Sequence, residues 1–425
     1  MPSLWKTRPR RDRLNDASLA LFIVAWLAGL AYSINPGRFG FGHGFEMASI
    51  AKNLVERNTF GNPFDPALTG PTAALPPLYP MFLAFLIRVF GWPLPSALIA
   101  SIGFNAVTAG LMPRLAKAFF QDMRPGLIAG CLWIAAMPMM PQWDISFTVA
   151  ALALGCVFTS ESLRREDGSQ WLAVGAGAIG GIVSLLNPVA TIVFLLWVGY
   201  LILFGRAPAQ HAVRYFVTVA AVIGMCNAPW LLRNYRLWHA VVLRTNFGMT
   251  VYSSNNDCAA PSLSQSGLNG CYQRTHPIAS EAEVQLIRQL GEVEYDRRRT
   301  ADTVAWVRSH PGRFGQLTGA RIVEFWFPDP TLPGARMYLV WAVTLLSVPG
   351  MIVMFRHRET VGWLVLAIWL IYPLTYYVVV SADRYRYPIL WTSLLPAGYY
   401  LAGLWLRWQT MLYKRAGDPV PQAAP

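Results

Sequence analysis

The sequence is poor in charge and in cysteine, and each shortage excludes a class of protein. Only 13% of its 425 residues are Asp, Glu, Lys or Arg, while 54% are hydrophobic. This composition is too apolar for a soluble protein of this length. The five cysteines form no Cys-x-x-Cys pair, and the six histidines form no His-x-x-x-His pair. The sequence therefore shows no zinc-site spacing.

The apolar residues are clustered in runs of roughly 16 to 22 residues with almost no charge, the length at which a helix crosses about 30 Å of hydrocarbon. The runs predict an all-α polytopic membrane protein with about ten transmembrane helices. The first run follows basic residues and lacks a small-residue cleavage site, so we interpret it as an uncleaved span. The expected spans are 17–34, 96–113, 125–140, 143–163, 171–187, 188–204, 212–232, 337–355, 361–380 and 385–406.

The net charge of +13 could suggest nucleic acid, but basic residues beside cytoplasmic span ends explain it better. The apolar segment 77–90 decides the orientation. If it lies flat on the outer surface and the N-terminus is cytoplasmic, the short outer links 138–144 and 187–188 contain no Lys or Arg. If it crossed, the middle basic loops would lie outside, against the positive-inside rule. We therefore predict a surface helix at 77–90.

These spans divide the chain into four parts. An N-terminal transmembrane module (1–232) includes a first outer loop (35–95), a hydrophilic outer loop (233–336) forms a small, mainly helical domain, and C-terminal helices (337–407) precede a cytoplasmic tail (408–425). In the hydrophilic loop, Ser280 and Glu283 form a capping-box pattern that predicts a helix over 281–310, kinked near Gly291. Cys258 and Cys271 could form a disulfide there in an oxidising compartment, stabilising the protein by ~3 kcal/mol.

The first outer loop contains a polar amphipathic helix with two distinct faces. The apolar face carries Met47, Ile50, Ala51 and Leu54, and the polar face carries Glu46, Ser49, Asn53 and Glu56. Glu46 and His43 therefore lie just outside the membrane. A solvated interfacial charge is the alternative interpretation of Glu46. The neighbouring Gly42 and Gly44, which allow close backbone approach, favour a functional one.

A second carboxylate, Asp144, stands at the outer end of the fourth span in the segment PQWDISF. An acid at the edge of a membrane helix is a candidate functional residue by default, although an interfacial cap is the alternative. Arg384 and Arg386 (SADRYRYP) break the positive-inside pattern. Guanidinium groups bind phosphate through paired hydrogen bonds, so these arginines suit a phosphate or diphosphate better than snorkelling to headgroups.

Further phosphate-binding candidates stand at the outer end of the seventh span and at the start of the surface helix. They are Arg233, Asn234, Arg244 and Tyr79. The chemistry that uses such a set is glycosyl transfer from a phosphate leaving group. A carboxylate deprotonates the acceptor hydroxyl, and cations take the charge that develops on the departing phosphate.

The order and placement of several segments resemble the GT-C superfamily of polyprenyl-phosphate-sugar-dependent glycosyltransferases. The branch is that of bacterial dolichyl-phosphate-mannose-protein mannosyltransferase-like and aminoarabinose-transferase-like proteins. The resemblance extends over most of the chain. The segments are GFEMASIAKNL, TGPTAALPPLYP, WDISF, PWLLRNYRLW, LRTNFGMTVYSSNN, HPGRF and RYRYP.

The resemblance implies an inverting glycosyltransferase with its active site on the periplasmic face of the bacterial inner membrane. It also implies an undecaprenyl-phosphate-type donor, a catalytic acid in the first loop, a second acid at the fourth span, and cations on the lipid phosphate. The acceptor is a protein, a lipid or a glycan, and no nucleic acid is involved. No cofactor is required by the sequence, and a divalent metal is compatible with the family but not indicated.

The family's usual first-loop Asp aligns with His43, about one helical turn before Glu46. Either Glu46 or His43 serves as the base, or the protein is catalytically altered, and we predict Glu46. Two other functions stay open. A transporter or flippase would need broken spans near the midplane, whereas the one strong break, Asn187–Pro188, fits a tight outer turn. A non-catalytic subunit of an envelope complex would fit the missing Asp.

Overall fold

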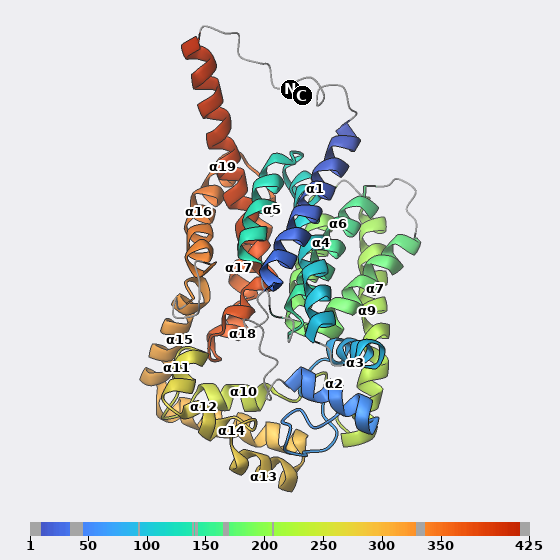
Figure 1. Ribbon diagram of the computed structural model, residues 1–425, viewed down its shortest axis with the longest axis vertical. Helices are drawn as coiled ribbons and strands as arrows, with labels where there is room; N and C mark the ends of the chain where they lie inside the picture. The colour runs from blue at the N-terminus through green and yellow to red at the C-terminus, as the bar shows by residue number, and fades with distance from the viewer. Residues whose placement is uncertain are drawn as a thin grey trace.

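The structure is a computed structural model that describes residues 10–34, 46–91, 94–137, 140, 143–164, 170–205, 208–328 and 336–416. Over these ranges the chain is built from helices and contains no β-strand. Figure 1 shows a bundle of long helices above a layer of shorter ones. The prediction of an all-α protein is confirmed.

Each of the ten expected spans coincides with a helix of the bundle, except that 361–380 is divided between two. The bundle consists of α1 (Arg10–Ser33), α4 (Leu94–Phe120), α5 (Arg124–Ala136), α6 (Ile145–Ser162), α7 (Gln170–Leu186), α8 (Pro188–Phe204), α9 (Ala209–Trp238), α16 (Arg336–Arg356), α17 (Val361–Ile371) with α18 (Leu374–Tyr377), and α19 (Tyr387–Ala416).

Six of these helices, α1, α4, α6, α9, α16 and α19, are long and apolar enough to cross a membrane on their own. The other four expected spans correspond to shorter apolar helices, α5, α7, α8 and α17–α18. Pro373 lies two residues after the end of α17 and explains the division there, since proline cannot donate the backbone hydrogen bond that would continue the helix. The chain is a multi-pass membrane protein.

The bundle is held by close backbone contacts at small residues, as is common between membrane helices. A Cβ added at Gly350 of α16 would lie 2.1 Å from the carbonyl oxygen of Pro396 in α19. One added at Gly398 of α19 would lie 2.3 Å from the carbonyl oxygen of Pro125 in α5. Any larger side chain at either position would separate α19 from its neighbours.

The first loop folds as α2 (Glu46–Arg57) and α3 (Leu78–Phe90), which pack together at the lower end of the bundle (Figure 1). The 13 residues of α3 extend about 20 Å, less than the hydrocarbon thickness of about 30 Å. The helix α5 of the bundle has the same length, so the prediction that 77–90 lies flat on the surface rests on the distribution of basic residues. The turn between the helices is closed by Asn62, whose side-chain oxygen accepts from the backbone N–H groups of Thr69 and Gly70.

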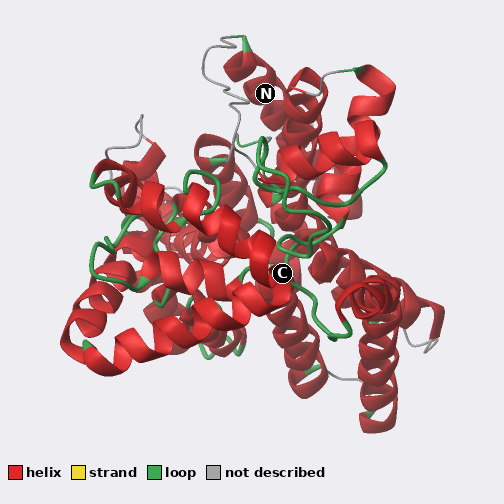
Figure 2. Cartoon of the chain, turned by 90° about the horizontal axis from the view of Figure 1, so that it is seen from below, coloured by secondary structure: helices red, strands yellow, loops and turns green. Residues whose placement is uncertain are grey.

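The helices between α9 and α16, which belong to the loop domain (233–336), form a layer below the bundle (Figure 1), and Figure 2 shows the protein from this lower side. Gly291, with a φ of +76°, separates α13 from α14, so the expected single helix with a kink is two helices. The helices are α10 (Phe247–Ser254), α11 (Leu263–Leu268), α12 (Cys271–Thr275), α13 (Glu281–Leu290), α14 (Glu292–Ser309) and α15 (Pro311–Trp326).

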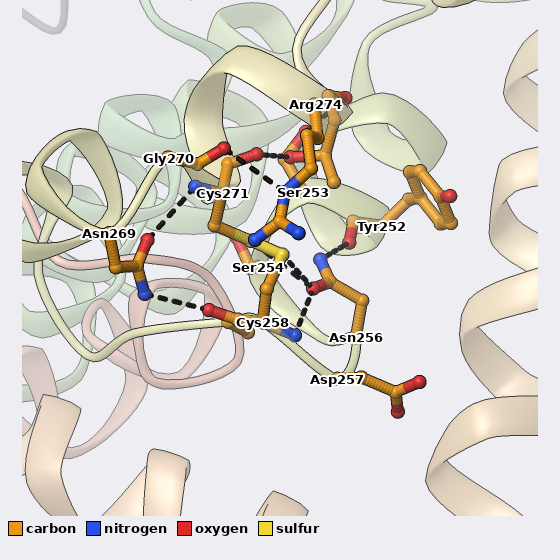
Figure 3. Close-up of a disulfide and its surroundings, with 12 residues drawn as sticks. Tyr252, Ser253, Ser254, Asn256, Asp257, Cys258, Asn269, Gly270, Cys271 and Arg274 are labelled. Atoms are coloured by element: carbon orange, nitrogen blue, oxygen red, sulfur yellow. Dashed lines mark hydrogen bonds between the residues drawn. A yellow bond between two sulfur atoms is a disulfide. The ribbon is translucent and has the colours of Figure 1, made fainter.

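Cys258 and Cys271 form a disulfide in the structure, with their Cα atoms 5.4 Å apart (Figure 3). Asn269 joins the same two residues a second time. Its side-chain amide donates to the carbonyl of Cys258, and its side-chain oxygen accepts from the backbone N–H of Cys271. Both links fix the start of α12, the short helix that leads to His276.

Candidate functional site

Glu46 and Asp144 stand at the first turns of two helices at the lower end of the bundle. Glu46 is the first residue of α2, and its side chain is 13% exposed. Asp144 directly precedes α6 and is buried, and its carboxylate accepts a 2.7 Å hydrogen bond from the hydroxyl of Thr148. Carboxylates are stabilised at helix N-termini, where the backbone N–H groups are unpaired.

Two arginines from distant parts of the chain face both carboxylates. Arg244 lies in the connection between α9 and α10, and Arg384 lies in the short helix η2 (Asp383–Tyr385) before α19. Each arginine interacts electrostatically with Glu46 and with Asp144. The structure therefore brings two acids and two arginines from four segments into one cluster, which we call the acid–arginine site.

Arg384 is held by aromatic rings. Its guanidinium lies 3.9 Å from the ring centre of Trp143 and 5.0 Å from that of Tyr385. It also donates to the Tyr385 hydroxyl at 3.4 Å. A guanidinium stacked on a ring is oriented by the ring while its N–H groups stay available in the plane. Arg384 is therefore fixed in position without an ion pair that would use all its donors.

Arg244 is positioned through the Pro-rich turn of the first loop. The Arg244 side chain donates to the carbonyl of Ala74 at 3.4 Å, and the backbone N–H of the adjacent Thr245 donates to the carbonyl of Ala73 at 3.1 Å. Glu292 of α14 joins both segments, because its carboxylate accepts from the N–H of Ala73 at 2.7 Å and from the Thr245 hydroxyl. Through Glu292, the loop domain thus holds the segment that carries Arg244 in position.

Replacing Glu292 by alanine should destabilise the protein by about 3 kcal/mol, because the buried donors on Ala73 and Thr245 lose their acceptor. Thermal unfolding of the purified protein measures the loss. Glu294→Ala is the matched control on the same helix. Glu294 is 58% exposed and forms a surface ion pair with Arg297, so its loss should cost about 0.5 kcal/mol or less. Equal effects would contradict this role of Glu292.

Three predicted phosphate ligands lie in structural networks instead. Arg233 donates to the carbonyls of Thr72 and Phe60 at 2.7 and 2.9 Å, which ties α9 to the first loop. The Asn234 amide donates to the carbonyl of Val242 at 2.8 Å. Arg386 is 3% exposed and donates to the carbonyl of Trp326 and to Ser393. Of the four predicted arginines, the structure brings two into the acid–arginine site.

Two predicted residues remain, Tyr79 and His43. Tyr79 lies in the site, and His43 lies outside the described ranges. Tyr79 of α3 is buried at 4% exposure and lies in the electrostatic field of Asp144, which together raise the pKa of its hydroxyl. The tyrosine therefore stays protonated and can donate a hydrogen bond. His43 lies outside the residues that the structure describes, so its prediction rests on the sequence alone.

Four site residues were missed by sequence reasoning: Tyr272, His276, Tyr376 and Tyr385. Tyr376 and Tyr385 are stacked with their ring centres 4.5 Å apart, and both lie in the field of Arg244. His276 approaches Glu46 with 3.7 Å between the histidine Nε2 and the carboxylate Oε1. Of these four, only Tyr385 could have been proposed from the sequence, because it lies between the two arginines of RYRYP.

Two opposing effects set the charge states of the site. Burial favours the neutral forms, and neighbouring opposite charges favour the ionised forms. Burial raises the pKa of Glu46, while its own backbone N–H and the two arginines act in the opposite direction. Burial lowers the pKa of Arg244, opposed by the neighbouring tyrosines and carboxylates. Opposite charges that face one another in a low dielectric favour the ionised forms. A carboxylate with an elevated pKa beside fixed cations is suited to accepting a proton.

The described part of the site offers two carboxylates, Glu46 and Asp144, together with arginines. Among the described residues no cluster of three or more His, Cys, Asp or Glu side chains could hold one. The groups that face Glu46 and Asp144 are arginines, whose positive charge repels a divalent cation. We derive no step through a metal.

The described residues define a polytopic membrane protein whose acid–arginine site lies where the first loop, the loop domain and the bundle meet. In comparisons with known proteins, no family model and no curated protein matches the chain. Its fold, however, is similar to solved structures of an archaeal oligosaccharyltransferase, AglB from Archaeoglobus fulgidus.

The AglB complex with an inhibitory peptide and a dolichol-phosphate aligns with a TM-score of 0.54 and 13% identity, over 95% of this chain and 52% of AglB. The apo form of the Archaeoglobus fulgidus enzyme gives a TM-score of 0.54 and 11% identity over 94% and 52%. Its complex with Zn and sulfate gives 0.53 and 12% over 92% and 50%. The chain thus spans about half the length of these proteins.

The likeness shows that the chain shares the fold of these archaeal oligosaccharyltransferase structures, which agrees with the all-α membrane fold that the sequence resemblance predicted. It covers nearly the whole chain, including the first loop and the loop domain that carry the site. At identities of 11 to 13%, the likeness supports a shared fold and no shared activity, because proteins with unrelated chemistries can have one fold. The activity has to be argued from the acid–arginine site.

Proposed function

We propose that the protein is an inverting glycosyltransferase that moves a sugar from a polyprenyl-phosphate donor to an envelope acceptor on the outer face of a bacterial cytoplasmic membrane. The observation that carries the proposal is the convergence of Glu46 and Asp144 with Arg244 and Arg384 at one end of the bundle. Two acids beside two cations are the set required to deprotonate a hydroxyl and to bind a phosphate leaving group.

In the proposed reaction Glu46 takes the proton of the acceptor hydroxyl. The acceptor oxygen attacks the anomeric carbon, and the bond from that carbon to the phosphate oxygen breaks with its electron pair on the phosphate. The products are the glycosylated acceptor and polyprenyl phosphate, with the proton on Glu46. Arg244 and Arg384 stabilise the additional negative charge on the phosphate, which is the usual source of a large rate effect.

Asp144 acts in this scheme by holding the arginines. Its carboxylate is fixed by Thr148, its charge offsets the burial of Arg244, and it interacts electrostatically with Arg384. A site with two cations and one acid would carry excess positive charge before the donor arrives. Asp144 thus keeps both guanidinium groups ionised and in place until the phosphate replaces part of that interaction.

Two further observations support a lipid-linked donor. The apolar helix α3, with Phe85 and Val89 exposed at 58% and 54%, lies beside α2 at the lower end of the bundle. Apolar faces at this level contact the bilayer, and a donor with a polyprenyl chain must reach the site from there. The AglB structure is described as a complex with a dolichol-phosphate, which belongs to the same chemical class.

The proposal is tested by mass spectrometry of lipid-linked sugars and envelope glycans in a strain that lacks the protein. One polyprenyl-phosphate sugar should accumulate, and one glycan should lose a sugar. The accumulated lipid, given to the purified protein with an envelope extract, should lose its sugar with inversion at the anomeric carbon. Unchanged lipids and glycans in the mutant strain, with no transfer in vitro, would refute the proposal.

Because two arginines supply the positive charge, we expect transfer to continue at an unchanged rate after chelation of divalent ions. The measurement is the initial rate of sugar transfer before and after treatment with EDTA, with magnesium or manganese added back in parallel. A loss of transfer that one of these ions restores would show that a metal, rather than the arginines alone, stabilises the departing phosphate.

A further inference from the structure

His276 of the loop domain contacts the proposed base. Its Nε2 atom lies 3.7 Å from Oε1 of Glu46, and its side chain is 12% exposed. The distance is within the range of an ion pair, but His276 does not carry the charge that an ion pair needs. Burial and the nearby Arg384 lower the pKa of His276 to about 3. Burial and Arg384 therefore favour the neutral imidazole near neutral pH.

The hydrogen bond on the far side of the ring defines the tautomer. The backbone N–H of Ile278 donates to Nδ1 of His276 at 3.3 Å, so Nδ1 is an acceptor and carries no proton. In a neutral imidazole the proton then resides on Nε2. Nε2 is the atom that faces Glu46, so the histidine presents an N–H donor to the carboxylate. The contact is longer than a hydrogen bond, and such contacts commonly shorten when substrate binds.

The surroundings hold the ring in this orientation. Tyr272 stacks on the imidazole with the ring centres 4.6 Å apart, and Phe64 of the first loop approaches it edge-on at 6.1 Å. Ser253 donates to the carbonyl of Thr275, the residue before the histidine. The disulfide at Cys271 fixes the other end of α12. A ring fixed on several sides loses little further freedom when it donates to Glu46.

Four groups of the described chain act on the charge of Glu46. Arg244 comes from the α9–α10 connection, Arg384 from η2, and Tyr272 and His276 from the region of α12. The two cations favour the carboxylate, whereas burial favours the protonated acid. An N–H donor at Nε2 of His276, 3.7 Å from Oε1, would act in the same direction as the cations. Of these groups His276 is the neutral donor with its proton directed at a carboxylate oxygen.

We infer that His276 is a positioning residue for the proposed base, whose Nε2–H donor orients the Glu46 carboxylate and favours its ionised form. The inference rests on the proposed function for its catalytic meaning, but the contact itself exists without substrate. It assigns the loop domain a direct part in the site. It also makes His276 neither an acid nor a base, because its proton stays on Nε2 throughout.

The test measures the protonation of Glu46 in the whole protein without any donor. Infrared difference spectra recorded during a pH titration show the carboxyl band of Glu46, which is identified by its absence in Glu46→Gln. In His276→Phe the ring can still stack on Tyr272, but the donor is lost, so the midpoint should rise by about one pH unit. In His276→Gln the side-chain amide reaches the Nε2 position, and the midpoint should return close to the wild-type value.

His276→Asn is the second variant without a donor at the Nε2 position, since its shorter amide reaches only as far as Nδ1. It should shift the midpoint as His276→Phe does, and thermal unfolding shows which variants are folded. An unchanged midpoint in both Phe and Asn variants, or a Gln variant as shifted as they are, would overturn the inference. Absent sugar transfer by the wild-type protein would refute the proposed function while leaving this result intact.

Discussion

Replacing Glu46 by glutamine should lower the rate of sugar transfer by about 10²- to 10⁴-fold, the usual contribution of a positioned general base. The amide has nearly the same shape and can still accept from His276, but it cannot take the acceptor's proton. The wild-type rate should also fall as the pH drops through the pKa of Glu46. Burial raises that pKa above the ordinary 4.5, so the loss should occur at higher pH than for an exposed carboxylate.

The measurement is a pH–rate profile with the lipid-linked donor, and Glu56→Gln is its matched control. Glu56 lies on the same helix but is exposed, so its variant should keep the wild-type rate and profile. Donor binding by Glu46→Gln should remain, because Arg244 and Arg384 are intact. A fully active Glu46→Gln would identify a different base, for which the sequence offers His43.

The fold was predictable because the bilayer constrains it strongly. The apolar runs located every helix of the bundle, and the distribution of basic residues indicated that 77–90 lies on the surface. The break at Gly291 was predicted only as a kink, because the sequence does not show the positive φ of +76° that ends one helix and starts the next. The packing at Gly350 and Gly398 depends on which helices are neighbours, and no local pattern contains that information.

The site was predictable in its charges but not in its assembly. Glu46, Asp144 and Arg384 stood out because charge is scarce near membrane spans, and each lies in the cluster. Arg233 and Arg244 look alike in the sequence, yet Arg233 donates to two loop carbonyls whereas Arg244 faces the acids. Nothing in the sequence pointed to His276, because its role depends on a contact between the loop domain and the first loop.

Replacing Arg384 by glutamine should lower the rate of transfer by about 10²- to 10³-fold, because the departing phosphate loses one of its two cations. Arg384→Lys keeps the charge but loses the planar stacking on Trp143, so its loss should be intermediate. The folded state should be little affected, since Arg384 donates to no backbone carbonyl in the hydrogen bonds of the described chain. The measurement is the transfer rate at saturating donor, together with thermal unfolding.

Arg233→Gln provides the contrast that separates a phosphate ligand from a structural arginine. It removes donors to the carbonyls of Thr72 and Phe60, so it should cost about 2 to 4 kcal/mol of stability, while the folded fraction should keep most of its activity. Arg274→Gln, at an exposed position of α12, controls for the loss of one positive charge near the site. If Arg384→Gln lowered stability and Arg233→Gln lowered the rate of the folded protein, the two arginines would have to exchange roles, and the end of α9 rather than η2 would bind the phosphate.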